Sequence, residues 1–240
     1  MRHELYLEVF QELPKVKGFF STKYGASEGS PYDRPDVLQQ LGLEHAQPVW
    51  PVQVHKDRIA VIEQKGNAPI RIPDTDGSIT DVPGVLLTTV HADCLPVYLY
   101  DPVKGAIGLV HAGWRGTAAG IAPKAAALME QTFGCKAEDI LAHIGPGISS
   151  CCFETGPEVL EEFKRNWNFA EEFASPCGEG SEKNYLDLKG INRRQLEEAG
   201  LKAKRITASS HCTCCEPEIF CSYRREGGTY RRMGAGLCLL

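Results

Sequence analysis

Short apolar runs separated by turn residues dominate the first half of the chain, a pattern typical of β-strands. Residues 5–9 form the first of these runs, and Gly and Ser then make residues 18–33 a predicted loop. The segments 52–55 and 58–63 alternate apolar and polar residues on either side of a Lys-Asp turn. Three longer runs complete the predicted strands, at residues 85–90, 96–100 and 106–111.

After residue 114 the spacing of apolar residues changes from one typical of strands to one typical of helices. Residues 115–134 are rich in alanine and end at Gly134, which predicts a helix that Pro123 kinks or restarts. The remaining predicted elements are a strand at 139–145, helices at 156–166 and 188–200, and strands at 204–209 and 234–240. Because no break in composition divides the chain, we expect one α/β (mixed α+β) domain over residues 1–240, with a mixed β-sheet core covered by helices.

Charge and composition exclude several classes of protein. The formal net charge is -5, so no basic patch suggests a nucleic-acid partner. The longest apolar run, residues 84–90, is too short to span a bilayer, and the N-terminus lacks the pattern of a signal peptide. We therefore expect a cytoplasmic protein without a membrane partner, whose ten cysteines are reduced thiols.

Histidine and cysteine side chains gather at predicted strand ends. Cys94 follows one strand end, and His111 lies where another strand meets a glycine-rich turn. The third ligand of a metal site could be His91, which forms H-x2-C with Cys94, or the distant His55. Without a metal, Cys94 could instead be a nucleophile with His111 as its base and Asp93 as the orienting carboxylate. Measuring the metal content of the purified protein would distinguish the metal-site hypothesis from the nucleophile hypothesis.

Two glycine-rich turns offer places for a ligand. The turn "HAGWRG" joins a strand to a helix start, where backbone amides and the helix dipole favour an anion that Arg115 could also bind. A tight turn with a surface arginine explains the same residues equally well. The Gly-Pro-Gly of "IGPGISSCCFETG" either lets the backbone approach a ligand closely or simply connects a strand to a helix.

A second cluster of cysteines lies at residues 212–221. Its spacing, C-x-C-C-x5-C, lacks the paired C-x2-C arms that structural zinc usually takes. We therefore expect buried free thiols here rather than a metal. The following segment, "CSYRREGGTYRR", carries four arginines, and we expect one of them to face the site.

Four motifs in one order carry a resemblance to a known family: "ADCLPV", "HAGWRGTAAGI", "IGPGISSCCFE" and "CSYRREGG". The chain resembles, over nearly its whole length, the multicopper polyphenol oxidoreductase (laccase domain) family. That family is also called the peptidoglycan editing factor or purine nucleoside phosphorylase family. The resemblance implies a mixed α/β sandwich of one domain. It also implies a metal, usually zinc, held by His55, Cys94 and His111, which makes His91 a neighbour rather than a ligand.

The resemblance further implies phosphorolysis of adenosine, inosine, guanosine and methylthioadenosine, with some deamination of adenosine. We expect Zn2+ as the cofactor, with Cu2+ as the alternative, and a nucleoside and phosphate as small-molecule partners of a monomer or weak homo-oligomer. Asp93 and Arg115 are the expected catalytic residues. The expected substrate-binding residues are Lys23, Gln53, Gly113 and Arg232.

Two positions depart from the pattern that the family usually has. Lys23 and the residues up to Ala26 stand where an arginine and His-Gly-Gly are usual, and Arg232 in "TYRRM" is the best match to a later arginine. Arginine and lysine differ in how they bind anions, so these departures concern substrate range.

Three other functions fit the same residues. A metal-bound water could release wrongly incorporated L-serine from a cell-wall precursor, an activity that the resemblance also implies. A copper oxidase of phenols ranks lowest, because one His2Cys cluster cannot supply the several coppers of laccase chemistry. A structural zinc module that binds another protein would unfold on chelation without turning over a small molecule.

Overall fold

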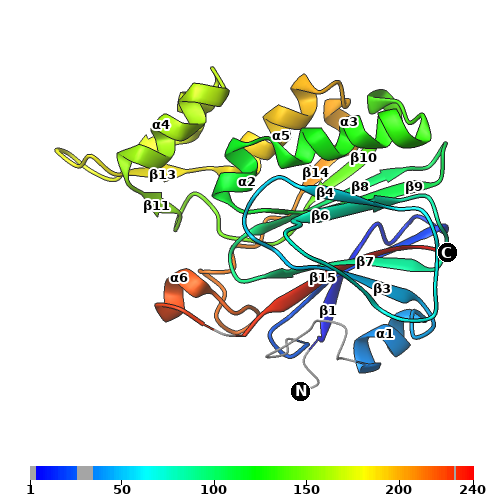
Figure 1. Cartoon of the computed structure of the whole chain (residues 1–240). Coiled ribbons are helices and arrows are strands. Elements are labelled where there is room, and N and C mark those ends of the chain that lie inside the picture. The colour runs from blue at the N-terminus through cyan, green and yellow to red at the C-terminus, as the bar shows by residue number, and fades with distance from the viewer. Residues whose placement is uncertain (1–3, 26–34, 230) are drawn as a thin grey trace.

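Two six-stranded sheets form the centre of the molecule in a computed structural model that describes residues 4–25, 35–229 and 231–240. They pack face to face, and the helices α3 and α5 cover the outer face of the second sheet (Figure 1). The first sheet has the order β1 (Tyr6–Val9), β2 (Val16–Ser21), β15 (Met233–Leu239), β7 (Val85–His91), β3 (Gln47–Pro51) and β5 (Ile70–Ile72). The second has the order β14 (Ile206–Ala208), β10 (Leu141–Ile144), β8 (Leu95–Asp101), β9 (Ala106–Ala112), β6 (Gly77–Thr80) and β4 (Ile59–Ile62).

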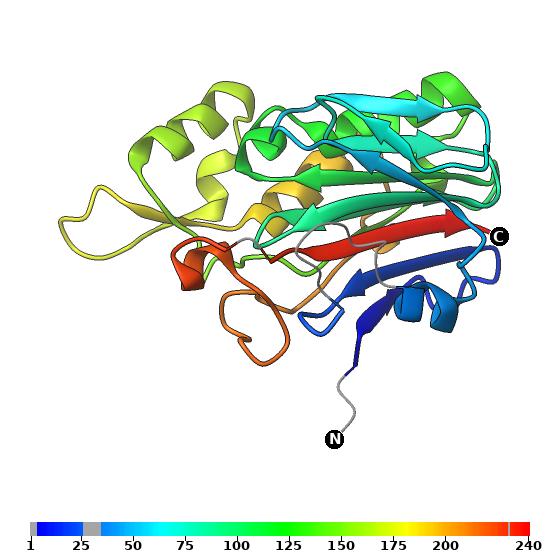
Figure 2. The ribbon, with the colours of Figure 1, turned by 60° about the horizontal axis from the view of Figure 1, so that its bottom comes forward.

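Both sheets mix parallel and antiparallel pairs. In the first, β15 runs antiparallel to both β2 and β7, whereas β3 pairs in parallel with β7 and β5. Figure 2 shows β15, in red, lying between the blue β2 and the green β7. A third, smaller sheet has the order β11 (Glu154–Thr155), β13 (Asn184–Leu186) and β12 (Ala174–Pro176).

Six α-helices are present among the described residues: α1 (Pro35–Leu41), α2 (Trp114–Ala118), α3 (Ile121–Phe133), α4 (Pro157–Asn166), α5 (Leu188–Glu198) and α6 (Tyr223–Glu226). Three short 3-10 turns lie at Ala137–Asp139, Ala170–Phe173 and Ala203–Arg205. No helix in this part of the chain is long and apolar enough to cross a membrane.

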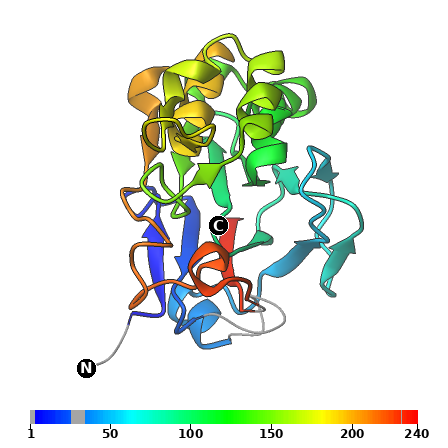
Figure 3. The same ribbon diagram turned by 90° about the vertical axis from the view of Figure 1, so that its left-hand side faces the viewer.

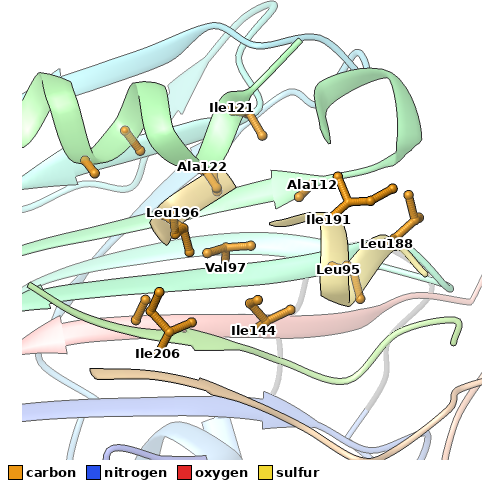
Figure 4. Packing of buried hydrophobic residues seen from close by; sticks show 14 of the residues in the cluster. Leu95, Val97, Ala112, Ile121, Ala122, Ile144, Leu188, Ile191, Leu196 and Ile206 are labelled. Atoms are coloured by element: carbon orange, nitrogen blue, oxygen red, sulfur yellow. The ribbon is translucent and has the colours of Figure 1, made fainter. Parts of the chain in front are cut away.

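Buried apolar side chains form three layers. Figure 4 shows the layer between the second sheet and its helices, where Val97 and Ala112 of the sheet face Ala122 and Leu196 of α3 and α5. A second layer, including Leu87 and Leu109, fills the space between the sheets. Alternate residues of β8 and β9 serve the two layers, so both strands are buried on both faces, as their continuous apolar runs predict.

The mixed α/β fold class is confirmed, and four details of the prediction are wrong. Gly18–Ser21 is no loop but the end of β2, because Phe19 and Phe20 are fully buried there. Residues 26–33 of that predicted loop lie outside the described residues. Residues 52–55 are no strand, because the backbone amides of residues 54–56 turn toward the buried Asp76 carboxylate. The predicted helix at 115–134 is two helices, α2 and α3, separated by Gly120 in the left-handed conformation (φ 76). The sequence pattern also does not predict the elements β3, β5, β6, β11–β13, α1 and α6.

Candidate metal centre

Three side chains that the sequence singled out converge at one end of the molecule. His55 lies in the turn after β3, Cys94 in the turn between β7 and β8, and His111 near the end of β9. One nitrogen or sulfur atom of each lies within 4.8 Å of the others. The imidazole rings of His55 and His111 stand nearly perpendicular, with centroids 4.9 Å apart. The site therefore joins both sheets, with ligand-type atoms aimed at a common point.

A buried carboxylate, Asp76, positions two of these residues. Its oxygens accept hydrogen bonds from the backbone N–H groups of Val54, His55 and Lys56, at 3.1, 2.9 and 2.9 Å. The same carboxylate accepts the Nδ1 proton of His111 at 2.9 Å. The three amide bonds hold His55 at a φ of 59, a conformation that costs a histidine energy unless its surroundings impose it. Asp76 thus fixes one imidazole through its backbone and the other through its ring.

His91 lies beside the centre but has both ring nitrogens engaged. Its Nδ1 donates to the carbonyl oxygen of Cys94 at 3.0 Å, which leaves Nε2 to accept from the Thr89 hydroxyl at 2.7 Å. Burial and the nearby charge of His111 hold the pKa of His91 well below its usual range, so the ring stays neutral. This agrees with His91 as a neighbour that positions Cys94 and not as a ligand.

The thiol of Cys94 and the imidazole of His111 favour each other's charged forms. Burial alone would raise the pKa of Cys94, but the charge of His111 and hydrogen bonds from His111 and His55 lower it to about 6. Burial likewise disfavours the imidazolium of His111, but the Cys94 thiolate and the bond to Asp76 raise its pKa to about 9. A thiolate, the form that binds metals, therefore exists at neutral pH.

The donor set suits zinc. Two imidazoles and one thiolate match the nitrogen and sulfur ligands of zinc, and three protein ligands leave the open position of a catalytic site. The Asp76–His111 pair is the carboxylate–histidine arrangement that orients a metal-bound imidazole. Space is also reserved: a Cβ at Gly113 would lie 3.1 Å from Cys94 Sγ and 3.4 Å from His55 Cδ2.

A cleft of about 1130 Å³ opens onto the centre and is lined by His55, Cys94 and His111. Arg115 of α2, Arg224 of α6 and Arg232 also line it, as do Trp50, Trp114 and Tyr223. The elements around this cleft lie at the left of Figure 1, and Figure 3 views the molecule from that end. Positive charge and aromatic surface therefore surround the candidate ligands.

The other candidate residues occupy different positions. The Arg115 guanidinium stacks 4.1 Å from the centre of the Trp114 ring, at the rim of the cleft. The Gln53 amide binds the backbone of Val90 through both of its polar atoms, at 2.9 and 2.7 Å, and so fixes the turn that carries His55. Lys23 lies away from the cleft lining, where its ammonium group donates to the carbonyl of Pro217 at 2.6 Å.

Asp93 lines the same cleft, and its carboxylate anchors a neighbouring loop. Its carboxylate accepts bonds from the hydroxyls of Thr213 and Ser222, at 2.6 and 3.0 Å, and from the backbone N–H of Arg224 at 2.7 Å. Its φ of 89 turns the chain sharply just before Cys94. The carboxylate therefore holds the Cys94 turn against α6.

Sequence reasoning missed Asp76, Thr213 and Ser222. Asp76 stands directly before a glycine and a short buried strand, and a fully buried carboxylate needs several donors. The sequence "DTDGSIT" carries that signal only once the segment is known to be a strand. No sequence pattern indicates a role for Thr213 or Ser222, because Asp93, to which both donate, lies 120 and 129 residues away in the chain.

The family model described as multi-copper polyphenol oxidoreductase laccase matches residues 32–240. A protein named purine nucleoside phosphorylase YlmD, from Geobacillus stearothermophilus, is 42% identical over 163 residues, which make up 68% of this chain and 59% of that protein. A protein named purine nucleoside phosphorylase, from Bacteroides thetaiotaomicron, is 34% identical over 92% of this chain and 84% of its own length. A protein named adenosine deaminase, from an unknown prokaryotic organism, is 34% identical over 85% of this chain and 79% of its own length.

Solved structures show the same fold. The crystal structure of the hypothetical protein YfiH from Bacillus licheniformis has a TM-score of 0.90 at 31% identity, covering 99% of this chain and 97% of that one. The crystal structure of YlmD from Geobacillus stearothermophilus has a TM-score of 0.83 at 28% identity, covering 99% of both chains.

Proposed function

The chain belongs to the multi-copper polyphenol oxidoreductase laccase family, and we propose that it is a zinc enzyme that cleaves purine nucleosides with phosphate. The observation that carries the proposal is the convergence of His55, Cys94 and His111 on the wall of a cleft with cationic and aromatic sides. Relatives named purine nucleoside phosphorylase support the choice of reaction.

The cleft suits the two substrates of such a reaction. Phosphate needs cationic donors, and Arg115, Arg224 and Arg232 face the same space. A purine base offers a flat apolar face, which the rings of Trp50, Trp114 and Tyr223 can contact. Tyr223 is 57% exposed, so part of this aromatic surface is free to take a ligand.

In phosphorolysis, a phosphate oxygen forms a bond to C1′ of the ribose while the bond from C1′ to the purine nitrogen breaks. The nitrogen keeps the electron pair and takes up a proton from the phosphate or from water. His55, Cys94 and His111 would hold the zinc ion, which would supply a Lewis acid at the cleft. The arginines balance the phosphate charge, and Asp76 keeps the proton of His111 on Nδ1 so that Nε2 faces the centre. We infer that Arg115 contacts the phosphate and that Asp93 acts by holding the Cys94 turn rather than as a base.

The test combines metal analysis with a product assay. His55→Ala, Cys94→Ala and His111→Ala are each expected to lose one equivalent of zinc and at least a hundredfold in phosphate-dependent turnover of adenosine and inosine. His45→Ala is the matched control, because His45 is exposed and lies outside the cleft lining. Retention of zinc and turnover by the three variants would overturn the proposal, and copper in place of zinc in the purified protein would overturn the choice of metal.

Deamination of adenosine is the second candidate, because one relative is named adenosine deaminase. Here water replaces the amino group at C6 and ammonia is released, so the reaction proceeds without phosphate. Ammonia release and ribose 1-phosphate formation, measured with and without phosphate, distinguish the two activities in the same sample.

A further inference from the structure

Four cysteines outside this cleft form a second cluster. Cys151 and Cys152 lie in the turn that follows β10, and Cys212 and Cys215 lie in the loop that follows β14. The Sγ atoms of the four cysteines all lie within 4.8 Å of one another. We propose that these four residues, called here the tetrathiol cluster, bind a single zinc ion through four thiolates.

The spacing of the sulfur atoms fits one metal ion. The contacts Cys151–Cys212, Cys151–Cys215 and Cys152–Cys215 measure 3.7, 3.5 and 3.3 Å between Sγ atoms. Four sulfurs about 2.3 Å from a tetrahedral zinc ion stand about 3.8 Å apart. An iron–sulfur cluster would place several irons and sulfides between its cysteines and spread them farther apart. The geometry therefore favours a mononuclear site.

The backbone places the cluster without help from a metal. Gly147 pairs with Cys212 as an isolated parallel bridge, and the N–H of Thr213 donates to the Gly147 carbonyl at 3.2 Å. Glu216 closes the second loop by accepting the Cys212 N–H at 2.8 Å. The two cysteine-bearing loops thus lie side by side for reasons independent of the thiols, which makes the site preorganised.

Positive charge and an amide donor compensate the thiolates. The N–H of Ser149 donates to Cys212 Sγ at 3.4 Å. Lys189, only 9% exposed, directs its ammonium group at the Ser149 hydroxyl and at the carbonyls of Ser209 and His211. Burial lowers the pKa of Lys189, and nearby Cys212 and Cys151 oppose that shift. A divalent ion with four thiolates carries two negative charges, and a buried lysine beside it offsets one of them.

Zinc binding at the tetrathiol cluster exchanges thiol protons for the metal ion. One Zn2+ forms four Zn–S bonds, and every thiol that was protonated releases its proton to solvent. Cys151 and Cys215 are exposed, so an ion can enter from solvent without opening the fold. The expectation of buried free thiols at residues 212–221 is wrong for Cys215, whose side chain is exposed.

The proposed ion is structural and acts on the cleft through Asp93. It would join the loop of Cys151 to the loop of Cys212, whose neighbour Thr213 donates to Asp93. Asp93 precedes Cys94, and its carbonyl accepts the N–H of Ile148 from the first loop at 2.8 Å. Both joined loops therefore contact the residue that holds the Cys94 turn.

Metal analysis of reduced protein, reconstituted with zinc alone, tests the proposal. The unaltered chain should hold one equivalent at the tetrathiol cluster, and Cys151→Ser combined with Cys215→Ser should lose that equivalent. Cys177→Ser is the matched control, because Cys177 is half-buried and is not one of the four cysteines. The variant Cys94→Ala should keep the cluster's equivalent, so failure of the proposed cleft chemistry and failure of this site give different results.

Cobalt gives a second readout that counts thiolates. With Co2+ in the Cys94→Ala background, intense thiolate-to-cobalt charge-transfer absorption should appear and should disappear when Cys151 and Cys215 are also replaced. Absence of that absorption in folded, reduced protein would contradict a tetrathiolate site.

Alkylation mapping uses the unaltered protein, so its result does not depend on whether a substituted protein folds. One equivalent of zinc beyond that held by the cleft should protect Cys151, Cys152, Cys212 and Cys215 together, while Cys177 reacts equally with and without zinc. Unchanged reactivity of the four thiols would overturn the proposal. So would a disulfide within the cluster of the native protein together with no zinc uptake after its reduction.

Discussion

The Asp76 carboxylate accepts the Nδ1 proton of His111 over 2.9 Å, and it is wholly buried where it does so. The bond decides which nitrogen of the imidazole is left for a metal. The amides of residues 54–56 share the same carboxylate, so one side chain sets the position of two candidate ligands from two different sheets.

Replacing this carboxylate should weaken metal binding without removing a ligand. We expect Asp76→Asn to lower zinc affinity at the cleft by about 10–100-fold, because an amide cannot accept from all four donors and leaves His111 free to change tautomer. Competition with a zinc-binding dye measures the change. Asp74→Asn is the control, because Asp74 is exposed and also has a positive φ of 49. Equal affinity of the two variants would refute the role assigned to Asp76.

Zinc affinity at the cleft should fall as the pH falls. In the metal-free protein, the pKa of Cys94 is about 6 and that of His111 about 9. Between these values the thiol is already ionised and zinc displaces one proton, from His111, so the apparent affinity rises roughly tenfold per pH unit. Below pH 6 the Cys94 thiol is protonated as well, so the affinity falls more steeply. Titrations from pH 5 to 8 in the Cys151→Ser, Cys215→Ser background measure it, and a flat profile would contradict the charged pair.

A methyl group at position 113 should crowd the centre. Gly113 has φ -70 and ψ 169, which alanine adopts without strain, so the effect of Gly113→Ala is steric alone. Its Cβ would stand 3.1 Å from Cys94 Sγ. We expect zinc affinity to fall on the order of tenfold, since overpacking costs about 1–3 kcal/mol. Urea unfolding of the metal-free variant serves as the control, and a normal zinc affinity would show that the centre yields to the added methyl.

The anchoring role of Asp93 predicts a loss of stability at a distant position. Thr213→Val keeps the shape of a wholly buried side chain but removes the donor to a buried carboxylate. We expect the free energy of unfolding to fall by about 1–3 kcal/mol in urea titrations. Thr132→Val should cost less than about 0.5 kcal/mol, because Thr132 is exposed on α3. If both variants were equally stable, Asp93 would not depend on this hydroxyl.

The candidate ligands could be found from the sequence because they lie beside strong local patterns. Cys94 and His111 border two continuous apolar runs, which form strands as predicted. His55 lies beside Cys94 and His111 as expected, but the strand predicted to carry it is absent. The segment turns toward the Asp76 carboxylate instead of pairing in a sheet, and predicting this would need the position of Asp76.

Contacts between segments that lie far apart in the chain could not be predicted from the sequence. The tetrathiol cluster combines residues up to 64 positions apart, which the parallel pairing of β10 with β14 and the Gly147–Cys212 bridge bring together. The C-x2-C arm of Cys212 and Cys215 finds its complement in two adjacent cysteines, so no second arm of that spacing exists to be recognised. Lys23 was singled out by motif position, and its contact with Pro217 shows that such a position does not determine where a side chain points.

The order of strands in the first sheet bears on how the protein is made. β15 pairs with β2 on one side and β7 on the other, yet residues 233–239 are translated after every other strand described. While the ribosome is still adding those residues, β2 and β7 each present an unpaired edge that can join a neighbouring chain. Nascent chains released before this point should therefore aggregate, and a chaperone that shields strand edges would act on this protein late in its synthesis.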